Sequence, residues 1–179
     1  MPDLPDRWPA IQVVMMPRDA NPLPGQTMLP DGRQIALYNS IFGGVLLAYI
    51  DMAGAIAAQR AIQLRGGNPK ASFVTVALNR VEFKKPVLVG DVVRFEATLV
   101  RIGRTSVTMR VDVVAERGAE TIHVTEAEAV FVGVDLSTPD RKPVVLFPDG
   151  SGFGSRDSGF RAEKPETGGG SGPAGSPES

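Results

Sequence analysis

The sequence predicts an α+β domain in which a curved antiparallel sheet is wrapped around one long central helix. Residues 41–58 form an apolar run without proline, which is typical of a buried helix. The segments after residue 72 alternate apolar and polar residues with a period of two, which is typical of half-buried strands. The links between these segments are short, and short links favour antiparallel pairing.

The residues before the helix predict one strand followed by an inserted segment. Residues 11–16 are apolar and end at Pro17, so we expect a first strand there. Residues 22–39 are rich in turn-forming residues, and Pro30-Asp31-Gly32 stands between two short apolar stretches. This pattern fits a small hairpin or an irregular loop equally well.

The helix itself is predicted to begin after Ser40, a suitable N-cap residue, and to end at Gly66-Gly67. Asp51 is the only charged residue between positions 41 and 58. A helix that is apolar on all faces lies inside a fold or in lipid. A central aspartate opposes membrane insertion by roughly 3 kcal/mol, so we expect the sheet to enclose this helix.

Four further strands complete the predicted domain of residues 1–147. They cover residues 73–83, 93–99, 107–113 and 121–134, and in the last of them Ala127 and Phe131 face away from Glu126 and Glu128. From residue 148 to residue 179 the chain is rich in glycine, serine and proline. Such a segment buries too little apolar surface to offset its ordering entropy, so we expect a disordered tail.

Composition excludes several functions and cellular settings. The 179 residues carry a formal net charge of −1, so no overall field attracts nucleic acid, and an anionic ligand needs a local basic patch. There is no cysteine, which excludes disulfides and thiolate metal sites and fits a reducing cytoplasm. The first residues contain acids and prolines and do not form a signal peptide. We therefore expect a cytoplasmic protein with neither a nucleic-acid nor a membrane partner.

Asp51 and the start of the helix are the candidates for chemistry. A carboxylate in an apolar helix is costly, so Asp51 is either bonded structurally or used as a general base or nucleophile. Gly43-Gly44 offers backbone N–H groups at the positive end of the helix dipole, a suitable oxyanion site. Gly44 and Asp51 are seven residues apart, so they share a helix face and could act on one substrate.

Two other groups have more ordinary interpretations. Lys84, Lys85, Arg101 and Arg104 stand at strand ends, where they hold a phosphate-bearing ligand or are simply solvated turn charges. His123 is the only histidine, and it lies on a predicted strand far from Asp51 in the sequence. Neither a metal cluster nor a Ser-His-Asp triad can be assembled around it, so we expect a surface residue.

Several motifs together resemble one known family. The stretches are M-M-P-R-D-A-N, I-F-G-G-V-L-L-A-Y-I-D-M-A-G-A-I-A-A, R-V-E-F-K-K-P-V-L-V-G-D-V-V and R-I-G-R-T-S-V. Residues 11–134 thereby resemble the hotdog-fold acyl-CoA thioesterases of the YciA-like and brain acyl-CoA hydrolase branch. The resemblance implies hydrolysis of acyl-CoA to free acid and coenzyme A without metal or cofactor. It also implies a homodimer with active sites between protomers, assembled further as a trimer of dimers.

The resemblance also implies roles for individual residues. Asp51 would act on the thioester, Asn21 of the facing protomer would assist it, and Gly44 would polarise the carbonyl. The family has only a few residues between its D-x-N motif and I-F-G-G, whereas residues 22–39 intervene here. Either this insertion loops out and leaves Asn21 in place, which we favour, or Asn39 takes its role. The implied substrate contacts are Asn39, Phe42, Gly43, Lys84, Lys85, Arg104, Thr105 and Ser106. A hydroxyacyl-thioester dehydratase and a non-catalytic acyl-CoA-binding module are the alternatives.

Overall fold

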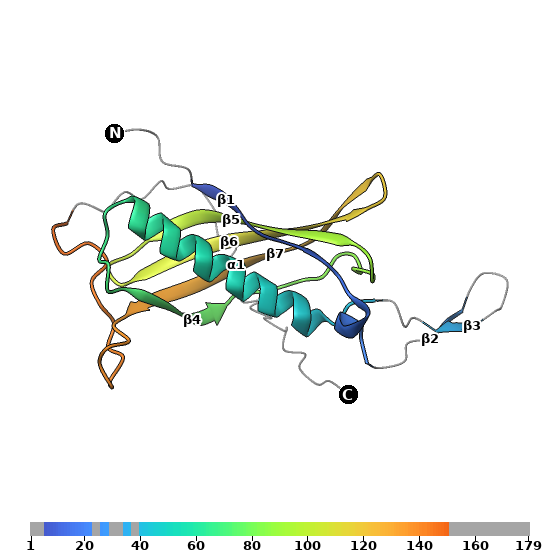
Figure 1. Ribbon diagram of the computed structural model, residues 1–179, viewed down its shortest axis with the longest axis horizontal. Coiled ribbons are helices and arrows are strands. Elements are labelled where there is room, and N and C mark those ends of the chain that lie inside the picture. The colour runs from blue at the N-terminus through green and yellow to red at the C-terminus, as the bar shows by residue number, and fades with distance from the viewer. Residues whose placement is uncertain (1–5, 23–25, 29–33, 37–39, 151–179) are drawn as a thin grey trace, which may run out of the picture.

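A five-stranded antiparallel sheet carries one long helix across one of its faces (Figure 1). The computed structural model describes residues 6–22, 26–28, 34–36 and 40–150. The strands follow the order β1-β5-β6-β7-β4. The elements are β1 (Arg7–Val14), α1 (Gly43–Leu64), β4 (Ser72–Leu78), β5 (Val92–Ile102), β6 (Ser106–Arg117) and β7 (Glu120–Val134). The predicted combination of a central helix and an antiparallel sheet is confirmed.

The core lies between α1 and the sheet face that it covers. Alternate residues of β6 are fully buried, among them Val107, Met109 and Val111. Small residues on the inner face of α1 let the helix approach the sheet closely. A Cβ atom on Gly54 would lie 2.6 Å from the ring of Phe131, so this glycine leaves the space that the ring occupies. The period-two pattern of the sequence therefore predicted the buried side of the sheet correctly.

The helix differs from the prediction at its start and on its outer face. Its N-cap is Phe42, and Ser40 instead pairs with Leu88 as extended backbone, so the predicted serine cap is wrong. The sheet covers only one face of α1, and Met52 and Ile56 remain exposed on the other. By length and composition α1 is able to cross a membrane, with a mean hydropathy of 1.4, but its inner face packs on the sheet.

The strand after the helix is shorter than expected. The prediction extended it to residue 83, whereas β4 ends at Leu78. Residues 79–91 instead cross beneath the start of α1 towards β5. They are held by β7, where the Thr125 hydroxyl donates to the Glu82 carbonyl oxygen at 2.8 Å. The Lys84 N–H also donates to the Val124 carbonyl oxygen at 2.8 Å.

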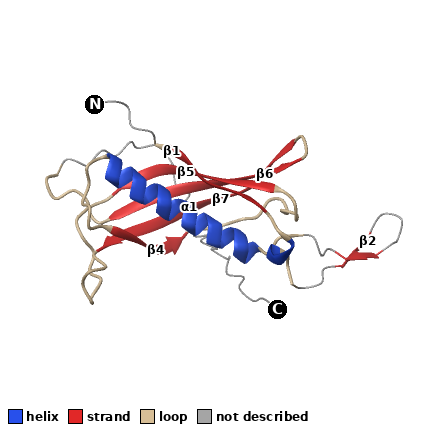
Figure 2. Cartoon of the chain, viewed as in Figure 1, coloured by secondary structure: helices blue, strands red, loops and turns tan. Residues whose placement is uncertain are grey.

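The inserted segment forms a hairpin, which is one of the two alternatives that the sequence left open. β2 (Gln26–Met28) and β3 (Gln34–Ala36) pair antiparallel, and their two-stranded sheet projects from the body beyond the start of α1 (Figure 2). The expected turn at Pro30-Asp31-Gly32 lies outside the described residues. The chain before the insertion forms the short 3₁₀ helix η1 (Pro17–Asp19).

The chain beyond β7 folds back under the helix end. Val134 pairs with Pro143, and the side chains of Leu146 and Phe147 are buried. Pro148 to Gly150 are exposed. Residues 151–179, most of the expected disordered tail, lie outside the described residues.

Candidate active site

Asp51 lies midway along α1 and faces the edge strand β4. The hydroxyl of Thr75 donates a hydrogen bond to Oδ1 of Asp51. Within the described part of the chain, no lysine, arginine or histidine forms an ion pair with Asp51. Its side chain is half-buried, so the expected enclosure of this carboxylate by its own chain is wrong. The reason is that Asp51 faces β4, the edge strand of the sheet, beyond which no further strand of the described chain covers it.

Thr75 was not among the site residues predicted from the sequence. One feature of the sequence could have indicated it: Thr75 is the single hydroxyl residue in the otherwise apolar segment F-V-T-V-A-L. On a strand, Phe73 and Thr75 point to the same side because side chains alternate. The strand also has a register irregularity between Thr75 and Ala77, a feature that re-aims side chains at functional sites.

The start of α1 is framed by two exposed phenyl rings. A Cβ atom on Gly44 would lie 2.5 Å from the ring of Phe42, and one on Gly43 would lie 3.4 Å from the ring of Phe83. No side chain caps the helix at Phe42, and its first turn contains no acidic residue. The first N–H groups of α1 thus lack side-chain acceptors and are suited to bind a carbonyl oxygen or an anion.

Gly44 and Asp51 are too far apart to share one carbonyl group within a chain. They belong to one continuous helix, and seven residues of α-helix span about 10 Å along its axis. A hydrogen bond requires about 3 Å between heavy atoms. This separation favours a carbonyl group that is held between the Gly44 of one copy and the Asp51 of another.

Asn21 lies beside the chain that enters α1. Its N–H donates to the Ser40 carbonyl oxygen at 2.7 Å, and Ala20 pairs with Ile41. The inserted segment thus leaves and rejoins the fold at the same point, and Asn21 stays close to the helix start. Asn39 lies outside the described residues.

The basic residues do not form one patch in a single chain. Lys84 and Lys85 are exposed and follow Phe83, whose ring lies against the start of α1. Arg104 is exposed at the other end, where its carbonyl oxygen accepts from the Leu146 N–H at 2.9 Å. Leu146 packs against Gly67, just beyond the helix end. Thr105 and Ser106 belong to this second group, and α1, with 22 residues, separates the two groups by about 33 Å.

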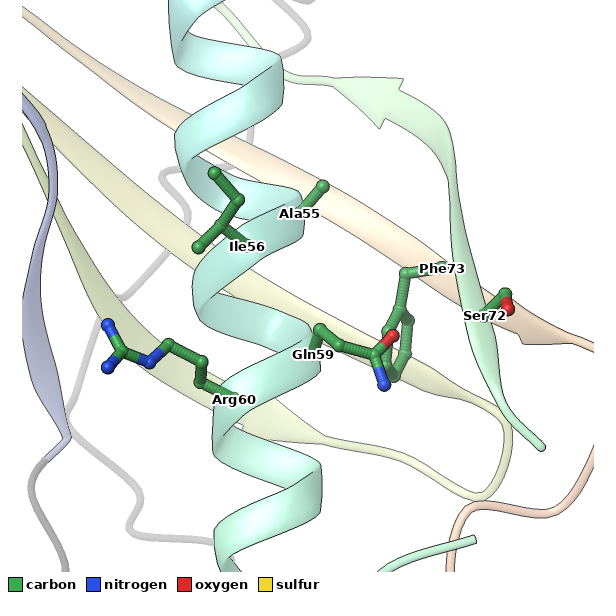
Figure 3. Close-up of a pocket in the computed structure, with 6 residues that line it drawn as sticks. All are labelled: Ala55, Ile56, Gln59, Arg60, Ser72 and Phe73. Carbon is green, nitrogen blue, oxygen red and sulfur yellow. The ribbon is translucent and has the colours of Figure 1, made fainter. Parts of the chain in front are cut away.

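A groove runs along α1 beside β4, one turn beyond Asp51 (Figure 3). Its volume is 430 Å³. Ala55 and Gln59 follow Asp51 at spacings of four and eight residues, so they continue the same helix face. Gln59 points towards the ring of Phe73, and Ile56 and Arg60, which also line the groove, extend from the helix in the opposite direction in this view. The groove thus begins one helical turn after Asp51, and its lining contains neither Asp51 nor Thr75.

His123 is exposed on β7, as expected for a surface residue. It lies eight residues before Phe131, the partner of Thr75, which corresponds to about 26 Å along the strand. The fold therefore does not bring it to Asp51. Within the described ranges, no group of three or more histidine, aspartate or glutamate residues is arranged to hold a metal ion.

Comparison with known proteins agrees with this geometry. The thioesterase superfamily model matches residues 38–122. A protein of Zymomonas mobilis, named an uncharacterised acyl-CoA thioester hydrolase, is 35% identical over 145 residues, which is 78% of each chain. The chain belongs to the hotdog-fold thioesterases.

Two further relatives support the same family assignment. The Escherichia coli acyl-CoA thioester hydrolase YciA is 36% identical over 111 residues, 59% of this chain and 76% of its own. The crystal structure of a hexameric hotdog-fold thioesterase of Campylobacter jejuni matches with a TM-score of 0.58 and 34% identity. That match covers 77% of this chain and 89% of the other. The resemblance inferred from the sequence motifs is confirmed.

Proposed function

We propose that this protein hydrolyses acyl-CoA thioesters to a free carboxylic acid and coenzyme A. The carrying observation is the carboxylate of Asp51, which is hydrogen-bonded by Thr75, unpaired with any described cation and placed one helical turn before a groove. The curated relatives from Zymomonas mobilis and Escherichia coli, both named acyl-CoA thioester hydrolases, support the same activity.

Asp51 acts as a general base or as a nucleophile. As a base it takes a proton from water while the hydroxide oxygen attacks the thioester carbonyl. As a nucleophile it attacks the carbonyl directly and forms a mixed anhydride, which water then hydrolyses. In both routes the carbon–sulfur bond breaks and coenzyme A leaves as a thiolate, which becomes the thiol by taking up the proton that the reacting water releases. The Thr75 hydroxyl holds one carboxylate oxygen and so orients the other towards the reacting atoms.

The reacting carbonyl is polarised by the N–H of Gly44 from a second copy of the chain. The separation of about 10 Å between Gly44 and Asp51 along α1 supports this arrangement. The exposed side chains Phe42, Met52, Ile56 and Phe83 give both parts of the site an apolar surface on which another copy packs. The hexameric assembly of the Campylobacter jejuni thioesterase supports a homo-oligomer, which we propose is a trimer of dimers.

The substrate contacts are divided between copies in the same way. Asn21 lies beside the helix start, so it assists the Asp51 of the facing copy by orienting water or the carbonyl. Lys84 and Lys85 from one end and Arg104 with Ser106 from the other meet at the phosphates of coenzyme A only across an interface. The reaction needs only water, a base and an oxyanion site, so no metal or cofactor enters the proposal. We also propose a cytoplasmic location, which the absence of cysteine supports.

The test is thiol release from a panel of acyl-CoA substrates, measured on the parent and on Asp51→Asn. The amide keeps the shape of the side chain and can still accept from Thr75, but it neither takes a proton nor attacks a carbonyl. We expect unchanged fold and oligomeric state and a turnover reduced by about 10²-fold to 10⁴-fold. Asp140→Asn is the control, because Asp140 is exposed in a distant turn. Turnover at the parental rate in Asp51→Asn would exclude this role.

A further inference from the structure

Asp91 carries the most buried charge in the described part of the chain. Its side chain is 3% exposed, and Thr125 is the other buried polar residue of that part. The Arg117 guanidinium binds it through two parallel bonds, Nε to Oδ1 at 2.9 Å and Nη2 to Oδ2 at 2.8 Å. The Leu88 N–H donates to Oδ2 at 2.8 Å. Both carboxylate oxygens are thus fixed in direction as well as in distance.

These bonds outweigh the cost of burial. Burial by itself raises the pKa of Asp91, but the hydrogen bonds from Arg117 and Leu88 and the charge of Arg117 together hold that pKa below its usual value. Asp91 therefore stays ionised and paired throughout the neutral range. We refer to the Asp91–Arg117 pair as the clamp.

The clamp fixes the turn of residues 86–91, and this turn binds the chain that enters α1. Arg117 also donates to the Pro86 carbonyl oxygen at 3.2 Å, so it holds both ends of the turn. Between those ends, the Val87 carbonyl oxygen accepts from the Ile41 N–H at 2.8 Å, and Leu88 pairs with Ser40. Two residues further along, the helix begins at Gly43.

The same turn also binds the segment that leads to Asn21. The Met15 N–H donates to the Asp91 carbonyl oxygen at 2.9 Å, and the Gly90 N–H donates to the Met15 carbonyl oxygen at 2.8 Å. After Met15 the chain forms η1, whose Asp19 carbonyl oxygen accepts from the Phe42 N–H at 3.0 Å. One turn therefore holds both the helix start and the segment that carries Asn21.

We propose that the clamp is a positioning device, which sets the place of the Gly43-Gly44 N–H groups and of Asn21 and thereby the rate of thioester cleavage. Only Asp91 of the pair is buried, and an ion pair with a partly exposed arginine adds little to stability, so the contribution of the clamp is a fixed geometry. Asp91 and Arg117 touch no substrate and act through the turn. The inference rests on the proposed function, because the positioned groups are its oxyanion and assisting groups.

The decisive variant is Arg117→Lys, which keeps the positive charge but loses the two parallel bonds. A displacement of a reacting group by 1 Å costs about 10²-fold in rate, so we expect kcat for thiol release to fall by about 10-fold to 100-fold. KM should stay within about twofold, because the clamp contacts no part of the substrate.

Arg94→Lys is the matched control. Arg94 pairs with Glu116 on the outer face of the sheet, and its side chain is 36% exposed against 37% for Arg117. Its kcat should equal that of the parent.

Amide hydrogen exchange separates positioning from a general loss of stability. In Arg117→Lys we expect exchange to rise at residues 40–45 and at Met15, with β6 and β7 protected as in the parent. Uniformly faster exchange over the whole sheet, or a parental kcat per folded molecule, would overturn the proposal. If Arg117→Lys does not fold, Asp91→Asn provides the same comparison, since it keeps the shape of the side chain and removes its charge. Absence of thiol release from the parent would refute the proposed function, while the exchange pattern would still test the clamp.

Discussion

Thr75 and Asp51 form a pair in which each residue explains the position of the other. The hydroxyl binds one carboxylate oxygen, and no second side-chain partner of Asp51 occurs among the described residues. Sequence analysis identified Asp51 because a charge in an apolar helix stands out. It missed Thr75, because threonine is common in strands and its partner is 24 residues away in the chain. A long-range contact of this kind has no local pattern.

Removing the Thr75 hydroxyl should slow the chemical step. A hydrogen bond to a charged group is worth about 1.5–3 kcal/mol, so Thr75→Val should lower kcat by about 10-fold to 100-fold with little change in KM. Thr75→Ser keeps the donor and should retain most of the parental kcat. Steady-state thiol release at saturating acyl-CoA measures both variants. Equal rates for Val and Ser at this position would show that the hydroxyl does not orient Asp51.

At the scale of the elements, the alternation of apolar and polar residues predicted which side of β5, β6 and β7 is buried, but not of β4, where Val76 and Leu78 are exposed. It did not predict the register, and the register aligns acidic residues on the outer face of the sheet. Asp112 of β6 lies opposite Glu96 of β5 and Glu126 of β7. Burial raises the pKa of Asp112, and the charge and hydrogen bond of Glu126 raise it further, while Arg110 and Arg7 act in the opposite direction.

This alignment makes stability depend on pH at Asp112. Because its pKa is raised on folding, the folded state binds the proton more tightly than the unfolded state. The stabilising contribution of Asp112 is therefore complete below an unfolded pKa of about 3.9 and is lost as the pH rises through the folded pKa. Asp112→Asn should raise the Tm at pH 7.5, and the gain should shrink towards pH 4. Thermal denaturation at both pH values measures it, with Asp140→Asn as the control. A lower Tm for Asp112→Asn at pH 7.5 would contradict the prediction.

At the scale of the whole molecule, the sequence predicted the elements but not which ends of them meet. Lys84 and Arg104 both stand near strand ends, yet the crossing of residues 79–91 brings Lys84 to the start of α1, and β5 carries Arg104 to its far end. For α1, too, the sequence predicted the element but not what it contacts. Its apolar outer face was evident, but composition does not distinguish a face covered by the same chain from one covered by another copy.

The exposed outer face of α1 gives the last prediction. Ile56 is 39% exposed beside the groove, and we propose that another copy of the chain covers it. A carboxylate buried there without a partner is costly, so Ile56→Glu should dissociate the oligomer and abolish thiol release, because Asp51 would lose the Gly44 N–H of the facing copy. Size-exclusion chromatography with light scattering measures the mass, and circular dichroism verifies the fold.

Leu136→Glu is the control. Leu136 is 56% exposed in the turn after β7 and lies away from α1, so its variant should keep the parental mass and rate. A parental oligomer in Ile56→Glu would place the interface elsewhere and would leave the 10 Å between Gly44 and Asp51 to be bridged in another way.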